Sequence, residues 1–176
     1  MNHPYAYYLE RAARWWPAET AVVEGEVRLA YRELDARASA LARALQALGV
    51  RKGDRVAVLQ SNTHRFMEAL AGAARAGAAF VPMLGMLTAD DHAWMLGDCG
   101  AEVLIAPAAA LAGRGQALRE RVPGLRHVIA VDAGEGALEY EALLAAHRGE
   151  APVVRGSEED LAQILYTSGT TGKPKG

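Results

Sequence analysis

The sequence predicts an α/β protein: a doubly wound, mainly parallel sheet with helices on both faces, and a small hairpin near the N-terminus. Short apolar runs, typical of buried strands, alternate with longer stretches whose apolar residues recur every three or four positions, typical of amphipathic helices. Glycine, proline and capping residues mark most boundaries between them. Strands that alternate with helices are usually joined by right-handed crossovers, which make neighbouring strands parallel.

The first half of the chain shows this alternation most clearly. From Glu33 to Leu48 apolar residues recur at helical spacing, and Gly49 is placed to end the helix. Thr88 and Asp91 have the spacing of a capping box for a later helix. The elements predicted here are an N-terminal helix carrying Tyr5, Tyr7, Tyr8, Trp15 and Trp16, a hairpin of 21–23 and 27–29, helix 33–48, strand 56–59, a helix capped within 61–63 and ending near 77, strand 79–81 and helix 88–97.

The second half continues the pattern with more interruptions. Gly113 and Gly115 interrupt one helical stretch, and the last apolar run leads directly into the final residues of the chain. In sheets of this kind ligands bind beyond the carboxyl ends of the strands, so we expect the final loop to lie there. The elements predicted are strand 103–106, helix 108–121, strand 127–131, helix 140–147, an extended pair at 153–154 and strand 163–167.

Composition excludes several classes of function. The chain has 19 basic and 21 acidic residues, and its net charge of −2 predicts no attraction to nucleic acid or to an anionic membrane. The single cysteine, Cys99, excludes an internal disulfide and a cysteine-rich zinc site. No apolar run has the length of a transmembrane segment, and the first residues lack the pattern of a secretory signal. We therefore expect a cytoplasmic protein.

The final residues, YTSGTTGKPKG (166–176), have the composition of a phosphate-binding loop. Glycines let backbone N–H groups turn toward an anion, hydroxyl side chains add donors, and lysines add compact positive charge. A flexible linker is the alternative, because linkers use the same residues. Two facts favour the loop: it follows a predicted strand without a spacer, and it holds two of only three lysines in a chain that otherwise uses arginine.

This loop differs from the usual nucleotide P-loop, in which GxxxxGK is followed by Ser or Thr and then by a helix. Gly169 and Gly172 are only three residues apart, and Lys173 is followed by Pro174. The proline favours continuation into another strand. Loop amides, hydroxyls and lysines would then hold the phosphate without a helix dipole behind them.

The same motif carries a resemblance to a known family. YTSGTTGKPKG resembles, residue for residue, the phosphate-binding signature of the AMP-forming adenylate-forming enzymes, which include acyl-CoA synthetases, adenylation domains of non-ribosomal peptide synthesis and luciferase-like ligases. Residues 29–58 and 77–106 are similar to the family's first long helix and to its following strands and helix, although 84–86 replace the usual Asn-Pro-Arg-like turn. Because members have several hundred residues, the resemblance implies that residues 1–176 are the N-terminal portion of the large AMP-binding domain, ending at the phosphate-binding loop.

The resemblance also implies a function. These enzymes convert ATP and a carboxylate into an acyl-adenylate and pyrophosphate, and then pass the acyl group to coenzyme A or another thiol. It implies ATP, Mg²⁺ and CoA as the cofactors of a full-length ligase and Lys175 as the catalytic cation. For the carboxylic acid substrate it favours a fatty acid, with aromatic acids and amino acids as the alternatives. The residues implied in phosphate binding are Thr167, Ser168, Gly169, Thr170, Thr171, Gly172, Lys173 and Lys175.

The resemblance places the rest of this machinery beyond Gly176, so we expect residues 1–176 alone to be inactive as a ligase. The strands missing beside the last one would leave a sheet edge able to pair with a second copy, so we also expect self-association. The alternative is a non-catalytic module that keeps the fold and binds nucleotide phosphates or assembles with other proteins.

Other chemically active residues are assigned structural roles. Asp90, Asp91 and His92 are adjacent at a helix start, where side chains do not converge on one ion, so we assign no metal ligand. Cys99 has no basic neighbour in sequence, which favours a buried structural thiol. Trp15 and Trp16 are expected to dock the N-terminal helix, with contact to a membrane surface as the alternative.

Overall fold

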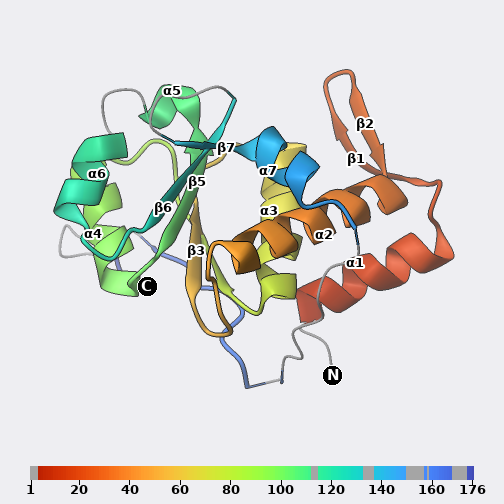
Figure 1. Cartoon of the computed structure of the whole chain (residues 1–176), viewed down its shortest axis with the longest axis horizontal. Helices are drawn as coiled ribbons and strands as arrows, with labels where there is room; N and C mark the ends of the chain where they lie inside the picture. Colours follow the sequence, from red (N-terminus) through yellow and green to blue (C-terminus); the bar gives the residue numbers. More distant parts are fainter. Residues whose placement is uncertain (1–3, 112–114, 133–136, 150–156, 158, 168–173) are drawn as a thin grey trace.

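The computed structural model describes residues 4–111, 115–132, 137–149, 157, 159–167 and 174–176. Within them lie a five-stranded parallel sheet, ordered β4-β3-β5-β6-β7, and a separate antiparallel hairpin of β1 and β2 (Figure 1). This confirms the predicted fold class. The elements are α1 (Pro4–Trp15), β1 (Thr20–Glu24), β2 (Val27–Ala30), α2 (Tyr31–Ala47), β3 (Arg55–Val58), α3 (His64–Ala76), β4 (Ala79–Pro82), α4 (Ala89–Cys99), β5 (Val103–Pro107), α5 (Ala108–Leu111), α6 (Gly115–Arg121), β6 (His127–Val131), β7 (Leu138–Glu139) and α7 (Tyr140–Ala146).

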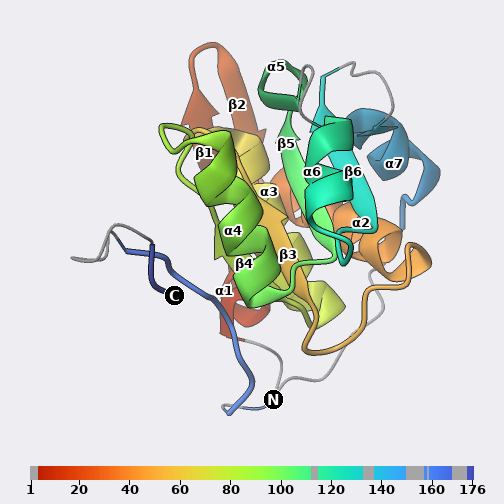
Figure 2. The ribbon, with the colours of Figure 1, turned by 90° about the vertical axis from the view of Figure 1, so that its left-hand side faces the viewer.

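The sheet is buried on both faces by two separate apolar layers. Successive side chains of a strand point to opposite faces, so Val56 and Val58 of β3 face one layer while Ala57 between them faces the other. Helices α2, α3 and α7 cover the first face, and α4, α5 and α6 cover the second. Figure 2 shows α4 and α6 in front of the sheet. Burial on both sides explains the nearly continuous apolar runs of the strands.

The order of the strands creates a switch point at β3. The chain passes from β3 to β4 on one side, and then crosses back to β5 on the other side of β3. The loops that leave the carboxyl ends of β3 and β5 therefore diverge, which is the usual origin of a ligand cleft in an open α/β sheet.

Two predicted helix starts had different outcomes. The capping box of α4 is confirmed, because Thr88 Oγ1 accepts a hydrogen bond from Asp91 N at 3.2 Å and Asp91 Oδ2 accepts one from Thr88 N at 3.1 Å. Capping of α3 by a hydroxyl within 61–63 is wrong. Thr63 makes no capping bond, and Glu24 of the hairpin instead accepts a hydrogen bond from His64 N at 2.7 Å.

One other predicted boundary is corrected, and one strand was missed. The stretch 108–121 contains α5 and α6, which agrees with the predicted interruption of this helix near Gly113 and Gly115. Helix α4 ends at Cys99, with Gly100 as its left-handed C-cap (φ 63°), rather than near Gly97. The short strand β7 was not predicted. The extended pair predicted at 153–154 lies outside the described residues. In the described part of the chain, no helix has both the length and the apolar character needed to cross a membrane.

A buried ionic cluster joins the three helices on the first face. The carboxylate of Glu68 on α3 is fully buried and lies 2.5 Å from Arg37 Nε of α2. It also accepts a hydrogen bond from Tyr140 Oη of α7 at 2.8 Å. Burial and the nearby Glu68 raise the pKa of the Tyr140 hydroxyl well above its ordinary value, so this hydroxyl remains a donor. Arg37 also binds Glu141 of α7 at 2.7 Å.

We predict that Glu68→Ala lowers the free energy of unfolding by about 3–5 kcal/mol, because it leaves the buried Tyr140 hydroxyl without its acceptor and removes one of the two carboxylates that bind the half-buried Arg37. Urea unfolding followed by circular dichroism measures this change. Asp90→Ala is the matched control, since Asp90 pairs with Arg121 on the surface and should leave the midpoint nearly unchanged. Equal midpoints for the two variants would show that the cluster contributes little.

Candidate functional site

The segment before the final loop lies along the outer edge of β4. Phe80 N donates to Ala162 O at 3.0 Å, and Ile164 N donates to Phe80 O at 3.1 Å, which makes one isolated parallel bridge. An ion pair of 2.8 Å between Lys52 and Asp160 holds the start of the segment. The prediction of a strand over 163–167 is therefore corrected to two isolated bridges, this one at Gln163 and another at Thr167. Two residues after Ile164, Tyr166 packs on α4.

Tyr166 is anchored to α4 by its hydroxyl and by its ring. Its Oη donates to Asp98 Oδ2 at 2.6 Å, and its ring stands edge-to-face on Trp94 with centroids 5.9 Å apart. Burial, followed by the hydrogen bond to Asp98, raises the pKa of the Tyr166 hydroxyl well above its usual value of 10.0. The hydroxyl therefore stays protonated and continues to donate at neutral pH.

The end of α4 that holds Tyr166 is itself fixed to the sheet. Arg55, at the start of β3, donates from Nε to Cys99 O at 2.7 Å and from Nη2 to Gly100 O at 2.6 Å. A guanidinium at these terminal carbonyls complements the negative end of the helix dipole. Cys99 is half-buried, and burial raises the pKa of its thiol, which fits the predicted structural role.

The two ends of the loop are joined at its base. Thr167 N donates to Lys175 O at 2.9 Å, and Lys175 N donates to Thr167 O at 3.0 Å. Pro174 is buried, whereas Thr167 and Lys175 are exposed. Gly176 lies so close to Tyr166 that a Cβ added there would be 2.8 Å from the ring atom Cζ. After the proline the chain therefore makes one isolated antiparallel bridge, at Lys175, rather than the predicted strand, and both ends of the loop lie beside the Tyr166 ring.

The structure describes two of the predicted site residues and brings them together. Thr167 and Lys175 are hydrogen-bonded neighbours at the base of the loop, with both side chains open to solvent. The other six predicted residues lie outside the described part of the chain: Ser168, Gly169, Thr170, Thr171, Gly172 and Lys173.

The position of the loop differs from the one expected. Asp98 is in the last turn of α4, just before β5 begins, so the base of the loop lies beside α4 at the β4 edge and not at the carboxyl ends of the strands. Figures 1 and 2 both show the C-terminus next to α4. The sequence pattern could not show this, because a single bridge to β4 leaves the segment free to turn toward the helix.

The carboxyl ends of β3 and β5 instead line a cavity of about 280 Å³, which the sequence reasoning missed. Gln60 and Ser61 directly follow β3, and their polar character immediately after a buried strand was the available signal. The Gln60 Nε2 atom is buried and has no hydrogen-bond partner. His92 Nε2 lies 2.9 Å from Leu84 O on another wall of the cavity.

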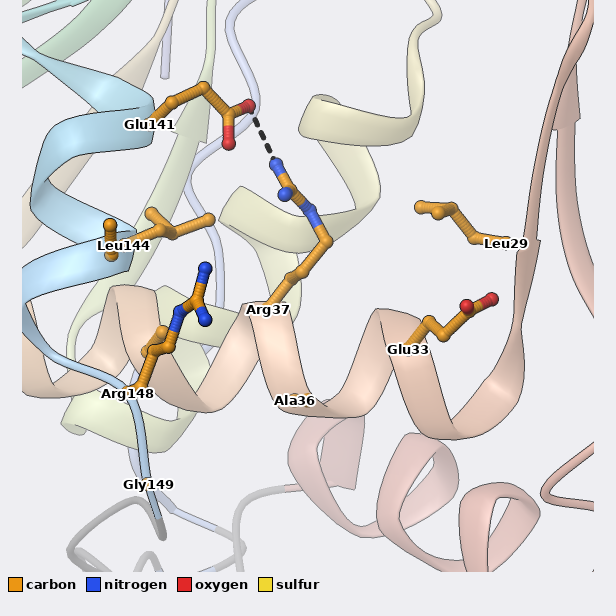
Figure 3. A pocket seen from close by; sticks show the side chains of 10 residues that line it. Leu29, Glu33, Ala36, Arg37, Glu141, Leu144, Arg148 and Gly149 are labelled. Carbon is orange, nitrogen blue, oxygen red and sulfur yellow. Dashed lines mark hydrogen bonds and ion pairs between the residues drawn. The ribbon is translucent and has the colours of Figure 1, made fainter.

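A larger groove, of about 800 Å³, lies on the opposite face of the sheet between α2 and α7. Figure 3 shows Arg37 reaching from α2 to Glu141 on α7, with the Arg148 side chain directed into the same space. The groove is separated from the loop by the whole sheet, since Tyr166 packs against the α4 layer. It therefore takes no part in phosphate binding at the loop.

Asp90, Asp91 and His92 at the start of α4 make three separate contacts. Asp90 pairs with Arg121 at 2.7 Å, Asp91 caps the helix, and His92 faces Leu84 O. Among the described residues, no group of three or more His, Cys, Asp or Glu side chains is arranged to hold a metal ion.

Comparison with known proteins decides the family. Residues 9–176 match the model of the AMP-binding enzyme family. The chain belongs to this family. It is 39% identical over 171 residues to feruloyl-CoA synthase of an Amycolatopsis species, covering 94% of this chain and 31% of that protein. It is 36% identical over 176 residues to the long-chain-fatty-acid–CoA ligase FadD13 of Mycobacterium tuberculosis, covering 97% and 33% respectively.

The fold has close counterparts among solved structures. The crystal structure of the anthranilate CoA ligase AuaEII in complex with anthranoyl-AMP superposes with a TM-score of 0.89 at 25% identity, and it covers 97% of this chain. The chain corresponds to 32% of that protein, so it spans about a third of the length of these ligases. The relatives are adenylate-forming ligases, as the resemblance implied.

We predict that Gly176→Ala weakens the base of the loop, because the added Cβ would collide with the rigid ring of Tyr166 and with Ile164. Hydrogen–deuterium exchange should then be faster at the Thr167 and Lys175 amides. Gly124→Ala is the control, since a Cβ there meets no atom within 4 Å. Unchanged exchange in the Gly176 variant would mean that the ring does not support the base.

Proposed function

We propose that this chain is the N-terminal portion, residues 1–176, of the AMP-binding domain of a carboxylate–CoA ligase, and that its final loop binds the phosphates of ATP. The observation that carries the proposal is the paired base of the loop. The mutual hydrogen bonds of Thr167 and Lys175 fix both ends while the Lys175 ammonium stays exposed to an incoming anion. Family membership supports ATP as that anion.

In the proposed reaction a carboxylate oxygen attacks the α-phosphorus of ATP, the bond to the bridging oxygen breaks, and pyrophosphate leaves. Negative charge grows on the departing phosphates, so a cation held beside them stabilises the transition state more than the ground state. We assign this role to Lys175. We further assign phosphate contacts to the backbone at Gly169 and Gly172, and to the side chains of Thr167, Ser168, Thr170, Thr171 and Lys173.

Magnesium and coenzyme A complete the proposal for the whole ligase. Mg²⁺ supplies charge neutralisation on the polyphosphate when it is bound. The hydrogen-bond donors of the loop are cationic or neutral groups, and a Mg²⁺ ion bound to the phosphates would be compatible with them. Among the described residues, no carboxylate is assigned as a ligand of this ion. CoA would accept the acyl group from the adenylate in the second half-reaction.

For the carboxylic acid we propose a fatty acid. Similarity over nearly the whole chain to a protein named long-chain-fatty-acid–CoA ligase supports this choice. The similarity to feruloyl-CoA synthase favours an aromatic acid as the competing substrate.

We also propose a cytoplasmic location, from the sequence pattern, and self-association of residues 1–176. Because the added bridge covers Phe80 of β4, such pairing would use the opposite sheet edge at β7.

We predict that Lys175→Ala in the complete ligase slows ATP–pyrophosphate exchange by about 10²-fold, the usual effect of losing one well-placed charge-stabilising donor. Thioester formation from pre-made acyl-adenylate should be spared, since pyrophosphate has already left. Arg28→Ala is the control: it removes an equal charge from the distant hairpin and should change neither rate. Equal loss of both half-reactions in the Lys175 variant would assign the lysine a structural role instead.

Residues 1–176 alone should bind ATP without activating a carboxylate, because they correspond to only about a third of the related ligases. Isothermal titration with ATP should give a binding signal that Lys175→Ala weakens. Exchange of labelled pyrophosphate into ATP should stay at the level of a protein-free sample with fatty or aromatic acids. Exchange above that level would contradict the proposed division of the enzyme.

A further inference from the structure

The residue that leads into the phosphate loop makes its side-chain hydrogen bonds to a single helix. Tyr166 Oη donates to Asp98 Oδ2 at 2.6 Å and lies 3.4 Å from Met95 O, and its ring rests against Trp94. All three partners are on α4, about 70 residues earlier in the chain. The loop is thus connected through one side chain to a rigid element of the fold.

Asp98 is unusual for its place in the helix. It lies in the last turn of α4, where the helix dipole disfavours a carboxylate, and its side chain is exposed rather than required by the core. Arg55 at the neighbouring carbonyls offsets part of that cost. The Asp98 carboxylate accepts a charge-assisted hydrogen bond from the Tyr166 hydroxyl, a type of bond that is short and strongly directional.

The ring of Tyr166 in turn supports both ends of the loop. Thr167 is the next residue in the chain, and Gly176 lies against the ring atoms Cζ and Cε1. Lys175 is joined to Thr167 by two hydrogen bonds. A lateral shift of the ring would therefore bear on the backbone on both sides of the loop, and on the position of the exposed Lys175 side chain.

We propose that Asp98 and Trp94 of α4 are positioning residues for the phosphate-binding loop, acting through Tyr166 to fix the orientation in which Lys175 meets the polyphosphate. This rests on the proposed function of the loop. Neither residue touches the phosphate. Asp98 holds the hydroxyl end of the Tyr166 ring, and Trp94 packs edge-to-face against the same ring. The loop is thereby organised before the anion arrives.

The test compares polyphosphate binding with folding in residues 1–176. Isothermal titration with ATP, and with tripolyphosphate as a probe without adenine, would be run on Asp98→Ala, Tyr166→Phe and the double variant. Each single change should weaken binding roughly 10-fold, the effect expected from losing a hydrogen bond to a charged group. Because both remove the same bond, the double variant should bind no more weakly than either single one.

Two further variants separate positioning from simple stability. Asp98→Asn keeps an acceptor for the Tyr166 hydroxyl and should restore part of the affinity. Asp90→Ala removes an exposed carboxylate from the first turn of the same helix and should bind as the parent does. Urea midpoints, measured on every variant, identify any that fail to fold; since Asp98 is exposed, its variants should keep the parent midpoint.

Each result decides the proposal. A parent that binds tripolyphosphate, together with an Asp98→Ala variant that binds equally well, overturns the positioning role and leaves the proposed function intact. Additive losses in the double variant overturn it as well, since the two residues would then act separately. A parent that binds neither ATP nor tripolyphosphate removes the proposed function and the positioning role with it.

Discussion

The proposed phosphate-binding loop needs fixed ends, and one pair of backbone hydrogen bonds between Thr167 and Lys175 joins both. This pair joins the chain on the two sides of the glycine-rich segment 168–173. It also places the Lys175 side chain in solvent at a defined point of the backbone. Without it, the lysine would be an ordinary surface cation with no preferred orientation toward a polyphosphate.

The fold supports this pair through a short series of contacts. The parallel sheet holds β3 beside β5, and Arg55 at the start of β3 binds the end of α4. Asp98 in the last turn of α4 then binds Tyr166, which lies against Gly176. The buried cluster around Glu68 joins the helices on the other face of the sheet. Stability and site position therefore depend on separate groups of polar residues.

Local signals in the sequence predicted most of the fold and the main candidate site. The capping box of Thr88 and Asp91 and the periodicity of α2 depend on residues a few positions apart, so they can be read directly. The loop motif could likewise be recognised from its own residues. What failed depends on distant partners: Glu24 caps a helix 40 residues away, and Tyr166 is drawn to Asp98 at a separation of 68. No pattern of neighbouring residues contains such contacts.

Two regions of this chain compete as the place where polyphosphate binds: the paired base of the final loop, and the cavity at the carboxyl ends of β3 and β5. Amide NMR of residues 1–176 titrated with tripolyphosphate distinguishes them most directly. If the loop is the site, the largest shifts occur at Thr167 and Lys175, with a smaller change at the indole of Trp94 behind Tyr166. Largest shifts at Gln60, Ser61 and His92, with Thr167 and Lys175 unmoved, would contradict a phosphate-binding role for the loop.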